Sequence, residues 1–250
     1  MEGRGFATPP AAPYDSFMTV LLNSGDTAAP RLERVALADG HAWVKRPERL
    51  RWLRRLQKGD ARAGFEAERR ALKALAAAGA PVPRIVDEGA DWFATEECGI
   101  TLDRLVGRAE GPRAFAAAGR ALADLHRAGF SHGRPAPKDM AWDGTRIALL
   151  DLERYAEARN TPRGHAWDLA IFVFSLHALA GDGPETGAAV AAYRAADRMG
   201  TWDRAARLVR RLAWVAPLAR WVAATRPEGR GKEWRAVAPT LAAFAQPSRD

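Results

Sequence analysis

The sequence predicts an α+β protein, in which a short strand-rich part precedes a longer helical part. Short apolar runs between turn residues indicate strands at residues 35–37, 41–44, 85–86 and 92–95. After Gly99 the apolar residues recur mostly three and four positions apart, which is typical of amphipathic helices. The order of these two patterns along the chain is the basis of the predicted fold class.

The remaining elements follow from local signals. A strand at residues 18–22 precedes the first hairpin, whose turn Asp39-Gly40 supplies the positive φ of a tight turn. Helical spacing covers residues 47–78, with a break at Gly59-Asp60, and a short buried strand at 147–150 ends at Asp151. Further helices are predicted at residues 112–126, 167–180, 186–199, 202–224 (with a kink at Pro217) and 233–244.

Composition excludes several classes of protein. Of the 250 residues, 48% are hydrophobic and 27% charged, which argues against disorder, a collagen-like repeat and an integral membrane protein. The most apolar segment, residues 166–180, contains Asp168 and His177 and is too short to span a bilayer without penalty. The single cysteine, Cys98, excludes an internal disulfide framework and favours a reducing compartment, so we expect a cytoplasmic location.

The net charge of +8 predicts an anionic partner. A nucleotide, a phosphorylated ligand and an anionic membrane surface all fit, whereas an arginine-rich genome is the alternative explanation. Nucleic acid is disfavoured, because no helix-turn-helix, zinc-finger or RRM motif is visible. Residues 46–58 combine basic and apolar side chains in an interfacial pattern, whose alternative is an ordinary solvated helix; they include Arg51, Trp52, Arg54, Arg55 and Lys58.

The strongest motif lies at residues 122–133, where the chain reads LADLHRAGFSHG. This run resembles the catalytic-loop entry of aminoglycoside phosphotransferases and lipopolysaccharide core kinases. Asp139 and Asp151 follow at nearly the spacing of that family, and residues 167–172 resemble its helix with a buried aspartate that holds the catalytic-loop backbone. Upstream, residues 66–83 resemble the E-x-x-x-L…G-x-x-x-P segment of related atypical kinases, and residues 96–99 their hinge.

The resemblance implies a bilobal protein-kinase-like fold, with a small β-rich lobe at 18–98 and a helical lobe at 99–250. Residues 1–17 are expected to form a flexible tail, because the N-terminal stretch is rich in proline, alanine and glycine. The resemblance implies that Lys45 holds the phosphates of ATP and that Glu68 pairs with Lys45, although Glu68, and equally Glu66, could instead lie on an exposed helix face. Glu96 and Cys98 would lie at the nucleotide. Asp139 and Asp151 would bind Mg²⁺, whose preferred ligands are oxygens.

An ordinary structural role is the alternative explanation for each of these residues. Lys45 and Glu68 could be solvated surface charges, and the two aspartates could cap a turn and a strand end. The sequence also departs from the family at residues 23–26, where one glycine replaces the usual three. Phosphate cradling at that turn would therefore be looser.

Arg134 stands where the family has its catalytic aspartate. A guanidinium cannot accept a proton, so no general base is present at that position. Arg134 could contact the phosphoryl group in transfer, or it could lock the site by pairing with Asp139 or Asp151. Two functions therefore stay open, an ATP-dependent phosphotransferase and a non-catalytic pseudokinase that acts as a nucleotide-binding or membrane-associated regulatory partner.

The acceptor is expected to be a small molecule or a glycolipid. Only sixteen residues separate Asp151 from Asp168, without the segment that forms a peptide-binding platform in protein kinases. The resemblance favours a sugar or glycolipid such as lipopolysaccharide. We expect a cytoplasmic protein, with a peripheral position at the inner face of the membrane left open.

Overall fold

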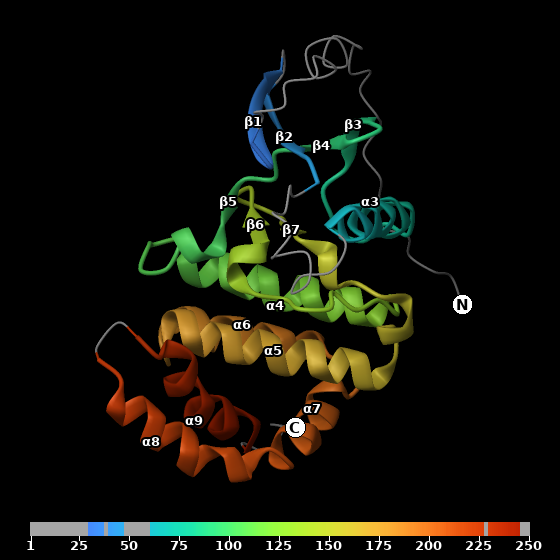
Figure 1. Ribbon diagram of the computed structural model, residues 1–250. Coiled ribbons are helices and arrows are strands. Elements are labelled where there is room, and N and C mark those ends of the chain that lie inside the picture. Colours follow the sequence, from blue (N-terminus) through green and yellow to red (C-terminus); the bar gives the residue numbers. More distant parts are fainter. Residues whose placement is uncertain (1–29, 38–39, 48–60, 228–229, 246–250) are drawn as a thin grey trace. The chain divides into compact units, whose positions relative to one another are not determined.

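The computed structural model describes residues 30–37, 40–47, 61–227 and 230–245. Figure 1 traces these parts as ribbons, coloured along the sequence. The predicted tail at 1–17, the strand at 18–22, the turn at 23–26 and most of the basic segment at 46–58 lie outside the described residues.

The chain forms two compact units. The first contains residues 1–98 and Asp151–Glu153, and the second contains Gly99–Leu150 and residues 154–250. Small antiparallel sheets and many helices make up the described parts, so the protein is α+β as the sequence predicts.

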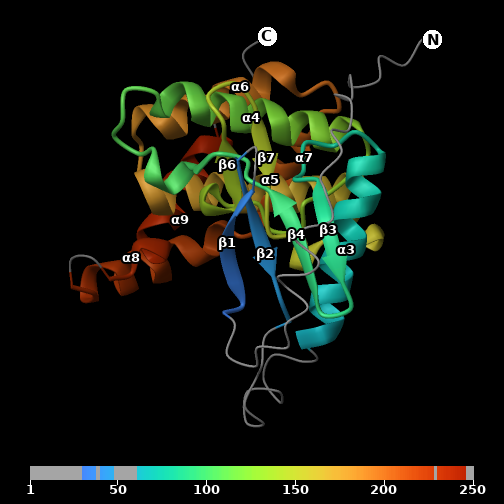
Figure 2. The same cartoon turned by 90° about the horizontal axis from the view of Figure 1, so that it is seen from above.

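The first unit is built on a four-stranded antiparallel sheet in the order β1-β2-β4-β3 (Figure 2). Its strands are β1 (Leu32–Leu37), β2 (Gly40–Lys45), β3 (Ile85–Gly89) and β4 (Trp92–Glu96). β1 pairs with β2 and β3 pairs with β4, which confirms both predicted hairpins. The central pair is β2 with β4, and this pairing brings strands from the two hairpins into one sheet.

One face of this sheet forms a small apolar core. Ala42 and Val44 alternate along β2 and are fully buried, as the two-residue period of a strand requires. They pack with Trp92 and Ala94 of β4. Helix α3 (Ala61–Ala77) packs on the opposite face, where the ring centroid of Phe65 lies 5.1 Å from that of Phe93, the residue between Trp92 and Ala94 on β4.

The second unit begins with a three-stranded antiparallel sheet in the order β5-β6-β7. Its strands are β5 (Ile100–Thr101), β6 (Met140–Trp142) and β7 (Ile147–Leu149). β7 confirms the predicted strand before Asp151. The sequence does not predict β6, because three buried residues are too few to show a two-residue period.

Helices make up most of the second unit. They are α4 (Gly111–Arg127), α5 (Pro162–Ala180), α6 (Pro184–Ala196), α7 (Thr201–Arg210), α8 (Ala216–Thr225) and α9 (Lys232–Ala245). Figure 1 shows α4 lying along α6, while α5 packs on α7 and α9. No helix in the described part of the chain combines the length and apolar content that a bilayer crossing needs.

The helix predicted at residues 202–224 is not continuous. α7 ends at Arg210, and a short 3-10 helix, η5 (Ala213–Val215), leads into α8. Pro217 therefore does not kink a helix but lies in the first turn of α8, where its missing N–H is not needed for helical hydrogen bonding. The prediction of a single kinked helix was wrong because helical periodicity continues across the break.

The close packing of α4 on α6 requires a residue without a Cβ atom at position 119, where the chain has Gly119. A Cβ atom at Gly119 would meet the backbone carbonyl oxygen of Ala189 on α6, so Gly119→Ala should destabilise the fold by about 1–3 kcal/mol. Gly187→Ala on α6 is the matched control, because nothing lies within 4 Å of the added methyl. It should stabilise by roughly 0.5–1 kcal/mol through helix propensity, as measured by urea denaturation. Equal effects of the two substitutions would contradict the described packing.

Candidate functional site

Glu68 is a charged residue in the buried stripe of α3. The buried side chains of this helix include Phe65, Leu72 and Leu75, at the spacing of one helical face, and Glu68 lies on the same face with 4% of its surface exposed. Burying a carboxylate costs several kcal/mol unless an opposite charge compensates it. The stripe therefore requires a cation opposite Glu68.

Lys45 supplies that cation. It is the last residue of β2 and lies opposite Phe93 of β4 in the antiparallel register, so both side chains point to the same face of the sheet. Phe93 contacts Phe65, and one helical turn later the Lys45 ammonium donates a hydrogen bond to the Glu68 carboxylate. The register of the sheet and the period of the helix thus bring this ion pair together.

Two more carboxylates surround the Lys45 ammonium. Its nitrogen lies 3.3 Å from a carboxylate oxygen of Glu153 and 3.9 Å from one of Asp151. Arg31, next to β1, donates a further hydrogen bond to Glu153. Glu68, Asp151 and Glu153 together offer carboxylate oxygens that lie within 4.8 Å of one another.

The electrostatics of these carboxylates differ with their surroundings. Burial raises the pKa of Glu68 above its ordinary value, and the charge of Lys45 offsets only part of this effect. Burial acts in the same direction on Glu153, but the charges of Lys45 and Arg31 outweigh it and lower its pKa. The acidic group therefore combines one carboxyl whose pKa is raised with one whose pKa is lowered.

Asp151 has an unusual backbone. Its φ of 55° lies in the left-handed region, and no other non-glycine residue in the described part of the chain has a positive φ. Aspartate tolerates this region better than most residues, but the conformation still costs of order 1–3 kcal/mol. Such strain persists where the surroundings hold it, and it clusters at functional sites.

Three carboxylate oxygens at this spacing form a donor set of the hard type that Mg²⁺ prefers. Glu153, in the 3-10 helix η3 (Leu152–Arg154), was not predicted as a ligand. It follows Asp151 by two residues, and the buried Leu152 between them anchors the segment. The sequence signal was present in Asp151-Leu152-Glu153, but only the fold shows that Glu153 turns toward Lys45.

The loop predicted to be catalytic is fixed by a second buried carboxylate, which lies in the second unit. Asp168 on α5 is 2% exposed and accepts hydrogen bonds from the backbone N–H groups of His132 and Gly133. Gly133 has a φ of 98°, and a Cβ there would meet the carbonyl of Arg154, so only glycine fits. The contact expected between Asp168 and the loop backbone is therefore present.

The neighbouring histidines support this arrangement. His126 lies 3.6 Å from Asp168, hydrogen-bonds to the hydroxyl of Tyr193 at 2.7 Å and stacks on His165. Burial, reinforced by His126, lowers the pKa of His165 to about 4, so His165 is neutral at physiological pH. These contacts give His126 and His165 a structural role in the packing around Asp168.

Arg134 and Asp139 also belong to the second unit. Arg134 is exposed, and its guanidinium forms no ion pair with any described residue. Asp139 is buried at the end of the 3-10 helix η2 (Pro137–Asp139), and its carbonyl accepts a hydrogen bond from the Leu150 N–H at 2.8 Å. Its carboxylate lies 3.8 Å from the Lys138 ammonium. The metal role of Asp139 stays a prediction.

The predicted hinge residues have partners within the first unit. Arg84 donates two side-chain hydrogen bonds to the carboxylate of Glu96, at 2.9 and 3.0 Å. The Cys98 thiol contacts the carbonyl of Glu96 at 3.6 Å. The Glu96 side chain therefore stabilises the end of β4, and a nucleotide contact at residues 96–98 stays a prediction.

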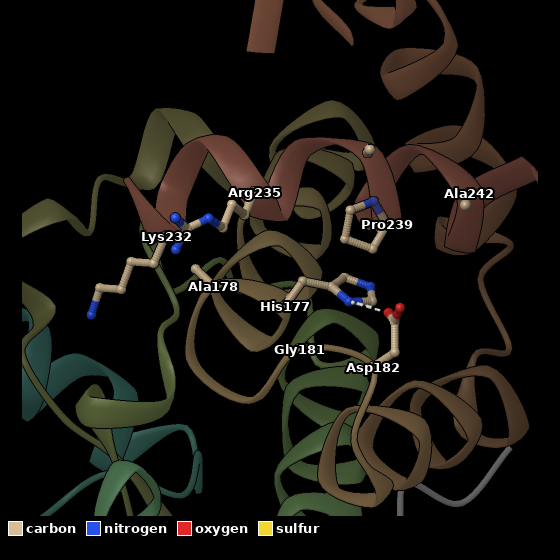
Figure 3. A pocket seen from close by; sticks show the side chains of 9 residues that line it. His177, Ala178, Gly181, Asp182, Lys232, Arg235, Pro239 and Ala242 are labelled. Carbon is tan, nitrogen blue, oxygen red and sulfur yellow. Dashed lines mark ion pairs between the residues drawn. The ribbon is translucent and has the colours of Figure 1, made fainter. Parts of the chain in front are cut away.

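A separate hollow of about 670 Å³ lies between the end of α5 and α9 (Figure 3). Its lining includes His177, Asp182, Lys232 and Arg235, and Nδ1 of His177 lies 3.0 Å from a carboxylate oxygen of Asp182. Burial lowers the pKa of His177. None of the residues predicted to bind nucleotide or metal lines this hollow.

Comparison with known proteins gives limited information. No family model matches the chain. A protein of Haemophilus influenzae (strain Rd), described as an uncharacterized protein, is 31% identical to it over 139 residues. The match covers 54% of this chain and 57% of that relative, so the chain spans little more than half the length of the relative.

The ion pair between Lys45 and Glu68 predicts a pH-dependent effect of Lys45→Met. Removal of the cation leaves Glu68 buried without a partner, and we expect a loss of roughly 3–5 kcal/mol in the free energy of unfolding at pH 7. The low pKa of Glu153 stabilises the fold above the unfolded value near 4.3, and this contribution disappears as pH falls through the folded pKa. In the variant the carboxylates take up protons more readily, so its deficit against the wild type should shrink below about pH 5.

Lys73→Met is the matched control for this experiment. Lys73 lies on α3 of the first unit and pairs with Glu88, but 53% of its side chain is exposed. Exposed pairs contribute at most about 1 kcal/mol, so the control should lose little at any pH. Thermal unfolding between pH 4 and pH 8 measures both variants, and a deficit of Lys45→Met that does not change with pH would contradict the assigned pairing.

Proposed function

We propose that this protein is an ATP-dependent phosphotransferase of kinase-like fold that transfers a phosphoryl group to a sugar or glycolipid. In this proposal Lys45 holds the phosphates of ATP, Glu68 positions Lys45, and Asp151 and Glu153 bind Mg²⁺. The bound ion would neutralise phosphate charge during transfer. Arg134 and Asp139 keep their predicted places in the catalytic loop.

The observation that carries the proposal is the group of Lys45, Glu68 and Asp151 in one compact unit. The motif order in the sequence required a lysine on a strand, a glutamate on the next helix and an aspartate after a distant strand to meet. These residues are separated by up to 106 positions in the chain, yet the lysine lies within ion-pair distance of both carboxylates. Convergence of titratable groups around one lysine is typical of functional sites.

A small acceptor is supported by the segment between Asp151 and Asp168. Residues 152–167 form η3, a second 3-10 helix, η4 (Glu157–Arg159), and the first turn of α5. This compact segment offers no extended stretch of backbone on which a peptide could lie. The choice of a sugar or glycolipid rests on the family resemblance alone.

The second candidate function is a nucleotide-binding pseudokinase without transfer activity. It is favoured by Arg134, since a guanidinium cannot serve as the general base. Phosphoryl transfer nevertheless depends mainly on positioning and charge stabilisation, and a base contributes roughly 10²–10⁴ in rate. In the proposed function the exposed guanidinium of Arg134 pairs with the phosphoryl group.

Nucleotide binding is tested by thermal unfolding in the presence of Mg-ATP. At a ligand concentration of 100 times Kd the native state gains about 2.7 kcal/mol, which corresponds to roughly 5–10 °C for a chain of this size. Lys45→Met and Asp151→Asn should abolish the shift, whereas Lys73→Met should retain it. Mg²⁺ alone should give a smaller shift that Glu153→Gln removes. No shift with saturating Mg-ATP would overturn the proposal.

Arg134→Ala distinguishes the two candidate functions. If Arg134 stabilises the transferring phosphoryl group, transfer from γ-labelled ATP to an envelope extract should fall by roughly 10²-fold or more while the thermal shift persists. Arg120→Ala, at an exposed position on α4, is the control and should retain activity. Nucleotide binding without any labelled product in the wild type would instead assign the pseudokinase function.

A further inference from the structure

Helix α8 presents an apolar stripe to solvent. Among its residues only Ala219 is buried, although most of the others are apolar. The exposed fractions are 73% for Trp214, 50% for Leu218 and 66% for Trp221. These three positions follow the spacing i, i+4 and i+7, so η5 and α8 carry them on one face. Large apolar side chains gathered in this way mark an interaction surface.

An apolar groove continues this stripe. The groove has a volume of about 240 Å³ and lies between α5, α7 and α9. Leu212 and Val215, which flank Trp214 along the chain, belong to its lining. Its one polar side chain, Thr240, already donates a hydrogen bond to the carbonyl of Ala236 at 2.6 Å. The complete lining is Trp167, Ala170, Ile171, Phe174, Val209, Leu212, Val215, Val237, Thr240 and Leu241.

The same part of the chain carries only positive charge. Residues 204–227 contain six arginines and neither aspartate nor glutamate. Five of the six are exposed, namely Arg207, Arg210, Arg211, Arg220 and Arg226. Asp203 and Glu228 border this stretch in the sequence, and the exposed arginines between them complement an anionic surface.

The combination of features selects among possible partners. A second copy of this chain would bring arginines against arginines, which is unfavourable. Nucleic acid would pair with the cations and stack on tryptophan, but it offers no aliphatic group that would contact Leu218 or fill the apolar groove. An anionic bilayer satisfies all three features, since its phosphates pair with arginine, its interface favours tryptophan and its acyl region accepts leucine.

We propose that η5 and α8, with the adjoining groove, dock this protein on an anionic phospholipid surface. Trp214, Leu218 and Trp221 would enter the interface between headgroups and acyl chains, while Arg211 and Arg220 contact phosphates. This docking surface lies in the second unit and shares no residue with the proposed nucleotide site. Its test is therefore independent of the proposed phosphotransferase activity.

The experiment measures co-sedimentation of the full chain with vesicles. One set contains phosphatidylcholine alone, and the other contains equal parts of phosphatidylcholine and phosphatidylglycerol. We expect binding to the second set that weakens as salt is added. The pair Arg211→Gln and Arg220→Gln should weaken binding by roughly fivefold for each arginine, and the pair Trp214→Ser and Trp221→Ser by at least about tenfold.

Matched variants separate local from general effects. The control pair is Arg104→Gln and Arg120→Gln, which removes the same charge from exposed positions elsewhere in the second unit and should retain binding to the anionic vesicles. Because the tryptophans are largely exposed, their replacement should leave the unfolding temperature unchanged. Equal binding of the tryptophan variant and the wild type would overturn the proposal, as would equal binding to neutral vesicles. Tryptophan-dependent binding of an oligonucleotide without vesicle binding would also overturn it.

Discussion

The buried carboxylate of Glu68 constrains everything around it. A charge in the apolar stripe of α3 is tolerated only if a cation is fixed opposite, and that cation can come only from a strand whose register is set. The contact of Phe65 with Phe93 sets the distance between helix and sheet, and Lys45 reaches Glu68 with 15% of the lysine side chain and 5% of the glutamate side chain exposed. The apolar pair Phe65–Phe93 and the ion pair Lys45–Glu68 lie one helical turn apart, and together they fix the position of α3 on the sheet.

The second unit also contains a buried carboxylate, and this one fixes a loop. Asp168 is buried on α5, and its partners are two backbone N–H groups instead of a cation. Hydrogen bonds of this kind satisfy a carboxylate and fix the chain that donates them. The backbone at Gly133 is therefore held in a left-handed conformation, and Arg134 follows from a fixed point. A loop without regular secondary structure thus acquires the precision that a reactive side chain needs.

Sequence reasoning was most successful where the family resemblance named both partners of a contact. It implied that Glu68 pairs with Lys45 and that the aspartate of residues 167–172 holds the catalytic-loop backbone, and both contacts are present. Glu153 was missed, because an acidic residue after a strand breaks no local rule and its orientation depends on the anchoring of Leu152. The break between α7 and α8 was missed for the opposite reason, since the helical spacing of apolar residues continues through Leu212 and Val215 although these residues line a groove instead of a continuous helix.

The charge balance of the candidate site gives the proposed function a physical basis. Three carboxylates face one lysine and one arginine, so the group carries about one net negative charge when all five are ionised. A divalent cation would reverse that sign and favour a phosphate chain. It would also relieve the repulsion that contributes to the raised pKa of Glu68, so that glutamate would hold Lys45 more firmly once the metal is bound. In the proposed function, metal and nucleotide therefore assist each other's binding, and Lys45 is the residue through which this coupling acts.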